Sequence, residues 1–215
     1  MRFLLPALLL LSCTCSPKTA PTRAAGTDEV LQVVENPPKN REQLIAVYAD
    51  LIREAPFNYG NVGSVLEALA VEGMRRRYPE PLHSVVSGIE YKDATGRTVG
   101  ELDLVVLHNE TGDALVVSEV KLSGNLRAAE QKANTQIKRF RESIANGEVV
   151  ELRLKGGAQT NYQPSQFTNV LIFGKIGSKG AVAEGFDWEV DLSRDEGDEL
   201  QAALLNKNSS GTPAF

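Results

Sequence analysis

The stretch that decides the fold is Gly100-Glu101-Leu102-Asp103-Leu104-Val105-Val106. A second apolar run, Val116-Val117-Ser118-Glu119-Val120-Lys121, follows it after the turn-forming residues 108–113. Alternating and β-branched apolar residues on both sides of Asn, Gly and Asp are typical of two strands joined as a hairpin. The second run is continuous enough to be a buried central strand. We therefore expect both strands near the middle of a sheet.

Charged side chains stand on both of these strands. Residues two apart share a face of a strand, so Asp103 lies with Glu101, and Glu119 lies with Lys121. Burying such groups is costly unless they pair with one another or hold a metal ion. Two carboxylates form a hard oxygen site suited to Mg²⁺. The arrangement predicts metal-assisted phosphodiester hydrolysis; the alternative is a solvated sheet face without chemistry.

The order of these motifs resembles that of the PD-(D/E)XK nuclease superfamily, which includes restriction endonucleases and archaeal-type Holliday-junction resolvases. The resemblance rests on Gly100-Glu101-Leu102-Asp103, on Glu119-Val120-Lys121, on Gln136-Ile137-Lys138-Arg139-Phe140, and upstream on Gly63-Ser64-Val65-Leu66-Glu67. It covers roughly residues 60–142, about the size of a minimal catalytic core. Several short motifs in the right order are more specific than any one of them alone.

The resemblance implies a restriction endonuclease-like α/β fold and a role for each motif residue. Asp103 and Glu119 would bind Mg²⁺, and Glu67 would reach the metal directly or through water. Lys121 would activate or position the attacking water. Gln136 would orient the site or contact DNA near the cleavage point.

Some positions leave alternatives open. Glu101 is either a supporting partner of the site or an outward-facing solvated carboxylate. Gln131 competes with Gln136, which we prefer because Phe140 follows it by one turn. Glu72 competes with Glu67 for the acid of the first helix, and Glu67 itself is open to interpretation as a surface residue.

The N-terminus has the pattern of a secretory signal. Met1-Arg2 is followed by an apolar run over residues 3–11 and then by Ser12-Cys13, an order of basic, apolar and small residues typical of signal peptides. The apolar run is too short to span a bilayer stably. The Leu-Leu-Ser-Cys ending resembles a bacterial lipobox, which implies a signal peptide over residues 1–12 and lipid attachment at Cys13. Cys15 is a less convincing alternative.

Few residues remain for other kinds of chemistry. The only cysteines are Cys13 and Cys15, and the only histidines are His83 and His108. The domain that follows the leader therefore lacks a disulfide framework, a structural zinc site and a thiol nucleophile. No phosphate-binding glycine loop or nucleophile elbow is present in the sequence.

The rest of the chain predicts one α/β domain behind a tether. Residues 13–40, rich in Pro, Ala and Thr, are expected as a flexible lipidated stalk, residues 41–206 as the domain, and residues 207–215 as a disordered tail. Apolar periodicity predicts helices over residues 41–54, 62–78, 126–146 and 195–205, and strands over 84–91, 98–107, 114–122, 168–174 and 186–192, the last of them at a sheet edge. A mixed sheet flanked by helices follows.

The charge distribution is mixed evidence for nucleic-acid binding. The net charge is -5 and the pI near 5.2, whereas nonspecific nucleic-acid binders usually display a basic footprint. Basic residues do cluster in two places: Arg75-Arg76-Arg77 ends the second helix, and Lys132, Lys138, Arg139 and Arg141 crowd the third. These are either phosphate contacts beside the site or solvated helix faces.

The leading hypothesis is an exported, lipid-anchored, Mg²⁺-dependent nuclease of the bacterial cell envelope. Mn²⁺ is expected to substitute for Mg²⁺, and DNA is a better candidate substrate than RNA by family analogy. The layout also resembles contact-delivered bacterial toxins, which would imply an immunity partner. The alternative from another class is a lipoprotein that keeps a nuclease-like fold as a binding module. A third version is a cytoplasmic protein whose leader is not a signal.

Overall fold

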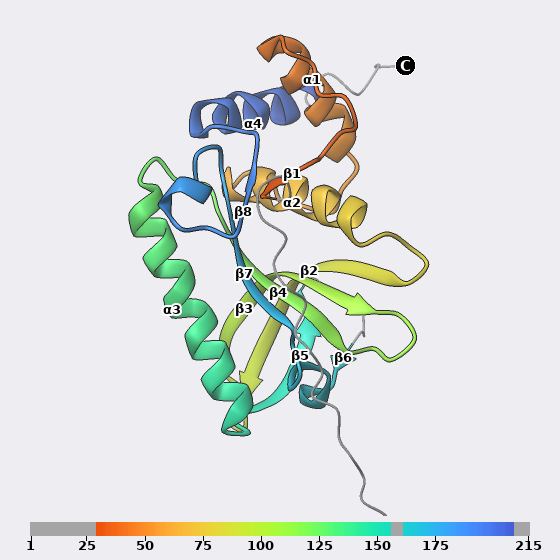
Figure 1. Ribbon diagram of the computed structural model, residues 1–215, viewed down its shortest axis with the longest axis vertical. Coiled ribbons are helices and arrows are strands. Elements are labelled where there is room, and N and C mark those ends of the chain that lie inside the picture. The colour runs from red at the N-terminus through yellow and green to blue at the C-terminus, as the bar shows by residue number, and fades with distance from the viewer. Residues whose placement is uncertain (1–28, 156–160, 209–215) are drawn as a thin grey trace, which may run out of the picture.

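The computed structural model describes residues 29–155 and 161–208. These residues form one mixed eight-stranded sheet and four α-helices (Figure 1). In chain order the elements are β1 (Val30–Leu31), α1 (Arg41–Ile52), α2 (Gly63–Arg77), β2 (His83–Asp93), β3 (Thr98–His108), β4 (Ala114–Lys121), α3 (Leu126–Ala145), β5 (Val149–Leu154), β6 (Asn161–Tyr162), β7 (Ile172–Gly177), β8 (Trp188–Val190) and α4 (Arg194–Asn208).

The sheet order is β1-β8-β7-β4-β3-β2-β5-β6, and the sheet divides into two halves at β4. From β1 to β4 all neighbouring strands are parallel, and from β4 to β6 all are antiparallel. The predicted hairpin is confirmed as the β3–β4 pair, and β4 lies inside the sheet. Val116 and Val117 point to opposite faces of β4 and are both buried, which is why this strand reads as a continuous apolar run.

Helix α2 covers one face of the sheet. Leu66, Leu69 and Met74 have no exposed surface and pack in the same apolar cluster as Leu104 of β3. Helices α1 and α4 contact each other and α2, and so form a second layer on this face, at the top of Figure 1. Asn40 begins α1 by accepting a hydrogen bond from the Gln43 backbone N–H, which satisfies one of the unpaired donors at a helix start.

Helix α3 covers the opposite face, and an aromatic cluster holds it there. The ring of Phe140 lies 5.0 Å from that of Tyr91 and 5.9 Å from that of Phe167, both edge to face. Such pairs contribute about 0.5–1.5 kcal/mol each beyond the apolar area that they bury. The helix ends where Gly147 adopts a positive φ of 69°, as a left-handed helix stop requires.

The predicted elements are confirmed with four corrections. The predicted strand over 168–174 is β7, which begins only at Ile172 because Pro164–Phe167 form a 3-10 turn. The predicted edge strand over 186–192 is β8, which is internal because β1 pairs with its outer side. Strands β5 and β6 were not predicted. Helix α4 continues to Asn208, into the predicted tail.

The predicted stalk over residues 13–40 is wrong for its last third. Val30 and Leu31 pair in the sheet with Glu189 and Val190, and Leu31 and Val33 are buried under α2 and its neighbours. The folded domain therefore includes residues from about 30 onward, because apolar side chains that are buried in this way are part of the core. The predicted signal peptide over 1–12, Cys13 and Cys15 lie outside the described residues. No helix among residues 29–155 and 161–208 is long and apolar enough to cross a membrane.

Candidate active site

The candidate site lies where β3 and β4 separate. Their pairing runs from Leu107↔Ala114 to Leu104↔Ser118 and stops there. The next pair in register would be Asp103 with Glu119. Beyond this point β4 continues to pair with β7 on its other side, as far as Lys121↔Gly177. The Val120 N–H instead donates to the Asp103 carboxylate at 2.8 Å, so a side chain takes the place of the backbone ladder.

The alternation of β3 side chains between the two faces of the sheet is also interrupted at Asp103. Leu102 packs in the cluster under α3, whereas Leu104 packs in the cluster under α2, although residues two apart in a regular strand share a face. The same change occurs opposite it on β2, where Gly88 has a φ of +70° between the pairs Ser87↔Leu104 and Ile89↔Leu102. This local irregularity turns Asp103 toward the end of β4.

Lys121 joins the two predicted carboxylates. Its Nζ donates to Asp103 Oδ2 and to Glu119 Oε2, each at 2.7 Å. The Glu119 side chain is 3% exposed, and those of Asp103 and Lys121 are 16% exposed. The three residues that the sequence singled out therefore form one largely buried cluster.

Burial and mutual charge shift the pKa values of Glu119 and Lys121 in this cluster. Burial, and then the negative charge of Asp103, raise the pKa of Glu119 to about 7, against the opposing effect of Lys121. For Lys121, burial lowers the pKa, but the two carboxylates outweigh it and the pKa is raised overall. A charged lysine is thus shared by two acids, and one of them holds its charge with difficulty near neutral pH.

Glu67 of α2 belongs to the same electrostatic environment. Burial raises its pKa to about 7, with further contributions from the charges of Asp103 and Glu101, while Lys121 and Lys155 lower it. Glu72, its competitor in the sequence, forms an ion pair with Arg75 instead. Of the two acids on α2, Glu67 is the one placed near the carboxylates of β3.

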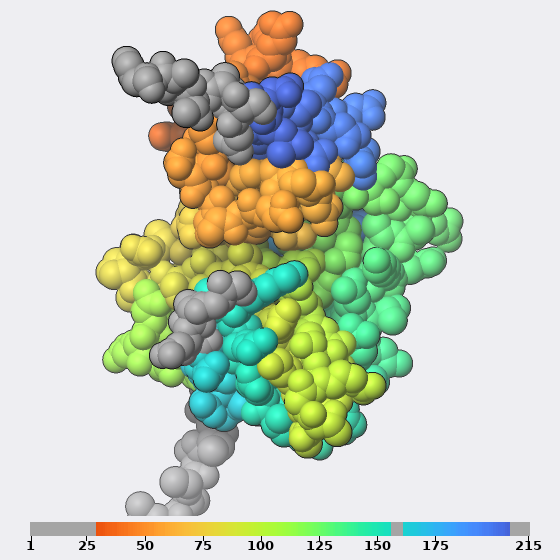
Figure 2. Space-filling view, turned by 180° about the vertical axis from the view of Figure 1, so that it is seen from behind, coloured from red at the N-terminus to blue at the C-terminus, as the bar shows by residue number. Residues whose placement is uncertain are grey.

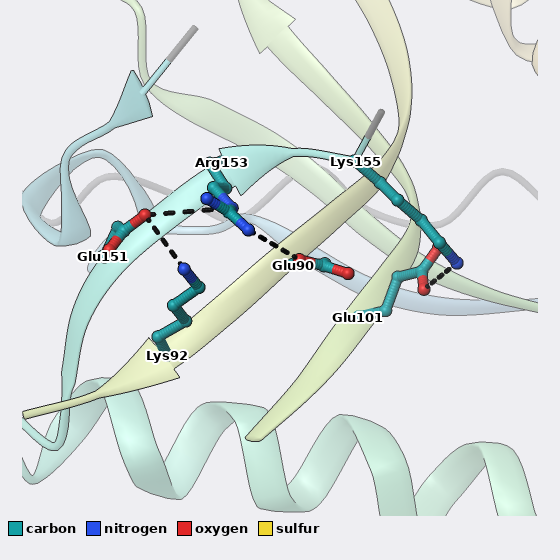
Figure 3. A network of polar contacts seen from close by, with 6 residues as sticks. All are labelled: Glu90, Lys92, Glu101, Glu151, Arg153 and Lys155. Carbon is teal, nitrogen blue, oxygen red and sulfur yellow. Dashed lines mark hydrogen bonds and ion pairs between the residues drawn. The ribbon is translucent and has the colours of Figure 1, made fainter. Parts of the chain in front are cut away.

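Glu101 is held by a partner that the sequence did not indicate. Lys155, directly after β5, donates to its carboxylate at 2.7 Å (Figure 3). The pair belongs to a row of charged side chains across β3, β2 and β5, in which Arg153 also lies 3.7 Å from Glu90. The alternation of charged and apolar residues in Glu151-Leu152-Arg153-Leu154-Lys155 is the period-2 signal that could have located this strand.

Gln136 lies on α3 and is half-buried. Its side-chain oxygen is buried and has no hydrogen-bond partner among the described residues. Gln131 is exposed, and its backbone oxygen accepts a hydrogen bond from Thr135. Phe140, one turn beyond Gln136, is in the aromatic core. The role of Gln136 in the site stays a prediction.

The predicted basic residues divide into two groups. The arginines at the end of α2 have structural partners: Arg75 pairs with Glu72, Arg76 donates to the Val33 carbonyl, and Arg77 lies over the Trp188 ring. On α3, Lys132 and Arg139 are exposed and share a helix face with Gln136, by their spacing of three and four residues. Lys138, on a neighbouring face, lies 3.8 Å from Glu142.

The residues fit a hard divalent cation by their chemistry, although they are not arranged around one. Among the described residues, no three His, Cys, Asp or Glu side chains are grouped as a ready metal site. The Lys121 ammonium lies between the carboxylates of Asp103 and Glu119. Oxygen ligands of this kind are those that Mg²⁺ prefers, and Asp103, Glu119 and Glu67 would hold it.

The chain has no match among the family models, curated proteins and solved structures with which it was compared.

Proposed function

We propose that this protein is a metal-dependent nuclease with a restriction endonuclease-like core. The observation that carries the proposal is the Lys121 ammonium 2.7 Å from both Asp103 and Glu119, at the point where two central strands separate. A structural ion pair of this kind is an expensive way to stabilise a sheet, because apolar residues of similar volume are often as good or better. Perturbed acids with a specific charge partner are typical of functional sites.

Each residue has a definite task in phosphodiester hydrolysis. Asp103, Glu119 and Glu67 would hold Mg²⁺ or Mn²⁺, which would stabilise charge on the phosphate oxygens and lower the pKa of bound water. Lys121, released from one carboxylate, would orient the attacking water and place a positive charge beside the phosphate. Gln136, with Lys132, Lys138 and Arg139 on α3, would contact the nucleic-acid strand.

The cellular location that we propose for this activity rests on the signal-like N-terminal sequence. With lipid on Cys13, the domain would act at the bacterial cell envelope, on DNA in preference to RNA. An exported nuclease could use external DNA or act as an antibacterial toxin, and a toxin would require an immunity protein in the producing cell.

A second candidate function is a binding module with a nuclease-like fold. The observation that favours it is charge: the net charge is -5, and all three arginines at the end of α2, although exposed, already contact other groups of the same chain. Such a surface attracts a polyanion less than the basic footprint of most nucleic-acid binders.

Cleavage assays separate the two functions. The full chain, purified in detergent, is incubated with supercoiled plasmid, linear duplex, single-stranded DNA and RNA, in Mg²⁺, Mn²⁺ or EDTA. We expect metal-dependent cleavage that falls at least about 10²-fold in Lys121→Met, a loss typical of removing one group that stabilises charge in the transition state.

Lys92→Met is the matched control for this variant. The Lys92 side chain is about as buried as that of Lys121, at 13% exposed, and it also pairs with a carboxylate, Glu151 at 3.4 Å, but it lies on β2 in the row of charged side chains, away from Asp103 and Glu119. Its activity should stay within about twofold of the parent, as for a change away from the site. A folded parent chain that cuts none of the substrates would favour the binding module.

A further inference from the structure

Glu101 and Lys155 meet across an intervening strand. Glu101 belongs to β3 and Lys155 follows β5, and β2 runs between these two strands. Gly88 of β2 leaves the space for them: a Cβ there would touch Glu101 Oε1 at 3.5 Å and Lys155 Cβ at 3.6 Å. The Lys155 backbone N–H also donates to the Gly88 carbonyl at 2.8 Å. The backbone of Lys155 is therefore held against β2, and its side chain extends past Gly88 to Glu101.

Lys155 is the accessible cation of the candidate site. Its side chain is 59% exposed, compared with 16% for Lys121. Its charge reaches the site, because it lowers the pKa of Glu67, while Glu101, Glu90 and Glu67 help to raise its own pKa. Only one of the three ammonium protons is needed for the bond to Glu101, so Lys155 can accept a second anionic partner from solvent.

A groove of about 620 Å³ begins at Lys155. It is bounded by residues 51–57 and α2 on one side and by β2 and the end of β5 on the other. It lies on the face of the molecule shown in Figure 2, where α2 is orange and β5 is teal. Along α2 it includes Val71 and Arg75, which follow Glu67 by one and two helical turns. A turn rises about 5.4 Å, so the groove starts next to the carboxylates and leads away from them.

The lining of the groove suits bases better than a duplex backbone. Phe57, Val71 and Val85, which pack in the apolar cluster under α2, line the groove, while Glu54 and Glu72 balance the charges of Arg75 and Lys155. Duplex DNA is bound mainly through phosphate-neutralising cations. Unpaired bases bind by stacking on aromatic and apolar side chains, which tolerates a neutral surface. The volume lies within the range of small-ligand pockets, about 300–1,000 Å³.

We propose that Lys155 binds the phosphate next to the scissile one, and that the groove beyond it holds the unpaired bases of the same strand. The inference rests on the proposed nuclease function and specifies its substrate class: nucleic acid with a single-stranded segment beside the cut, rather than continuous duplex. Lys155 acts here as a substrate-binding residue, and Lys121 remains the residue at the reacting phosphate.

The test compares two nucleic-acid ligands, using the full chain and its variants in detergent. Fluorescence anisotropy measures binding, in Ca²⁺ to limit cleavage, of a blunt DNA duplex and of the same duplex with a single-stranded overhang. Steady-state cleavage in Mg²⁺ then gives KM and kcat. The variants are Lys155→Gln, Ser87→Phe, which fills the groove from β2, and the control Lys92→Gln, from the same row of charges but outside the groove lining.

The parent is expected to bind the overhang substrate about tenfold more tightly than the blunt duplex, the gain of one stacked base. Lys155→Gln and Ser87→Phe should lose this gain and raise KM with kcat nearly unchanged, whereas Lys92→Gln should keep it. Lys155→Arg retains the charge and should therefore keep the tighter binding of the overhang substrate. It shows that the charge is what matters even if Lys155→Gln is poorly folded.

Each contrary result has a distinct meaning. Equal binding of the two duplexes by an active parent would overturn the groove proposal and leave the nuclease function standing. A fall in kcat without a change in KM in Lys155→Gln would overturn its binding role. A parent that neither binds nor cuts any nucleic acid would overturn both proposals, and the groove would then belong to another partner.

Discussion

Two groups of charged residues occupy the same sheet and differ in one physical respect. In the buried cluster, Lys121 joins Asp103 and Glu119 with side chains that are 3–16% exposed. In the open row (Figure 3), every ion pair has at least one side chain that is 39–59% exposed, and its members are Glu90, Lys92, Glu101, Glu151, Arg153 and Lys155. Both groups pair basic side chains with carboxylates, so burial is what separates them. Water screens the open pairs, which contribute about 0–1 kcal/mol each, whereas the buried acids depend on one lysine for their charge balance.

Removal of the central cation should give the largest difference between the two groups. Lys121→Met leaves two carboxylates buried and uncompensated, so we expect a loss of about 3–5 kcal/mol in the free energy of unfolding at pH 8 without divalent ions. Arg153→Met, its counterpart in the open row, should cost less than about 1 kcal/mol. Urea denaturation followed by circular dichroism measures both.

Divalent cations provide the control for this comparison. Mg²⁺ should recover part of the stability of Lys121→Met, since a bound cation compensates the same carboxylates, and should leave Arg153→Met unchanged. Equal losses in the two variants would mean that Lys121 is as well solvated as the open row, which would contradict the buried cluster.

The pH dependence of stability should show the same contrast with a smaller effect. Burial raises the pKa of Glu67 and of Glu119 to about 7 from the ordinary value of 4.5. A raised pKa means that the folded state holds these protons more tightly than the unfolded state does. The resulting stability is full below about pH 4.5 and is lost as pH rises through 7.

Between pH 5.5 and pH 8 in EDTA, we therefore expect the free energy of unfolding to fall by on the order of 2 kcal/mol. Carboxyls with a lowered pKa, such as Glu130, change ionisation below this window and do not contribute. Urea titrations at the two pH values measure the loss. Glu67→Gln should reduce it, Glu151→Gln in the open row should not, and a loss of the same size in Glu67→Gln would be evidence against a buried Glu67.

Local pattern predicted most of the fold and the centre of the site. The period-2 alternation around Asp103 and Glu119 is a property of neighbouring residues, and so are the helical spacings that predicted α1 to α4. Local pattern could not predict that the side chains of β3 change sheet face at Asp103. This change depends on Gly88 of another strand and on the point at which the β3–β4 pairing stops.

Contacts between distant parts of the chain account for the remaining errors. β1 is a pair of residues, Val30 and Leu31, whose place in the sheet depends entirely on β8. Composition alone assigned it to a stalk. Lys155 lies 54 residues from Glu101, and no local periodicity connects two such positions. The residues that complete the site are thus the ones that only tertiary structure brings together.

The smallest expected effect is a difference in stability between two glycine variants. It tests whether the side chains of the open row can move as freely as their exposure implies. Gly88→Ala places a methyl group against Glu101 and Lys155 at ordinary contact distances, 3.5 and 3.6 Å, and forces alanine into a φ of +70°. Gly96→Ala is the matched control, since Gly96 has a φ of +80° and a Cβ there would meet nothing within 4 Å. Each should lose about 1–2 kcal/mol of unfolding free energy through backbone strain.

Their difference is the informative quantity, because strain is common to both variants and contact with the Glu101–Lys155 pair is present only at Gly88. If the Glu101–Lys155 pair is solvated and can move aside, the losses of unfolding free energy in Gly88→Ala and Gly96→Ala, measured by urea denaturation, should agree within about 0.5 kcal/mol. An excess above about 1 kcal/mol at Gly88 that disappears in the Lys155→Gln background would show a pair held rigidly over β2. The open row would then be built around a fixed Lys155, and its difference from the buried cluster would be one of accessibility and not of rigidity.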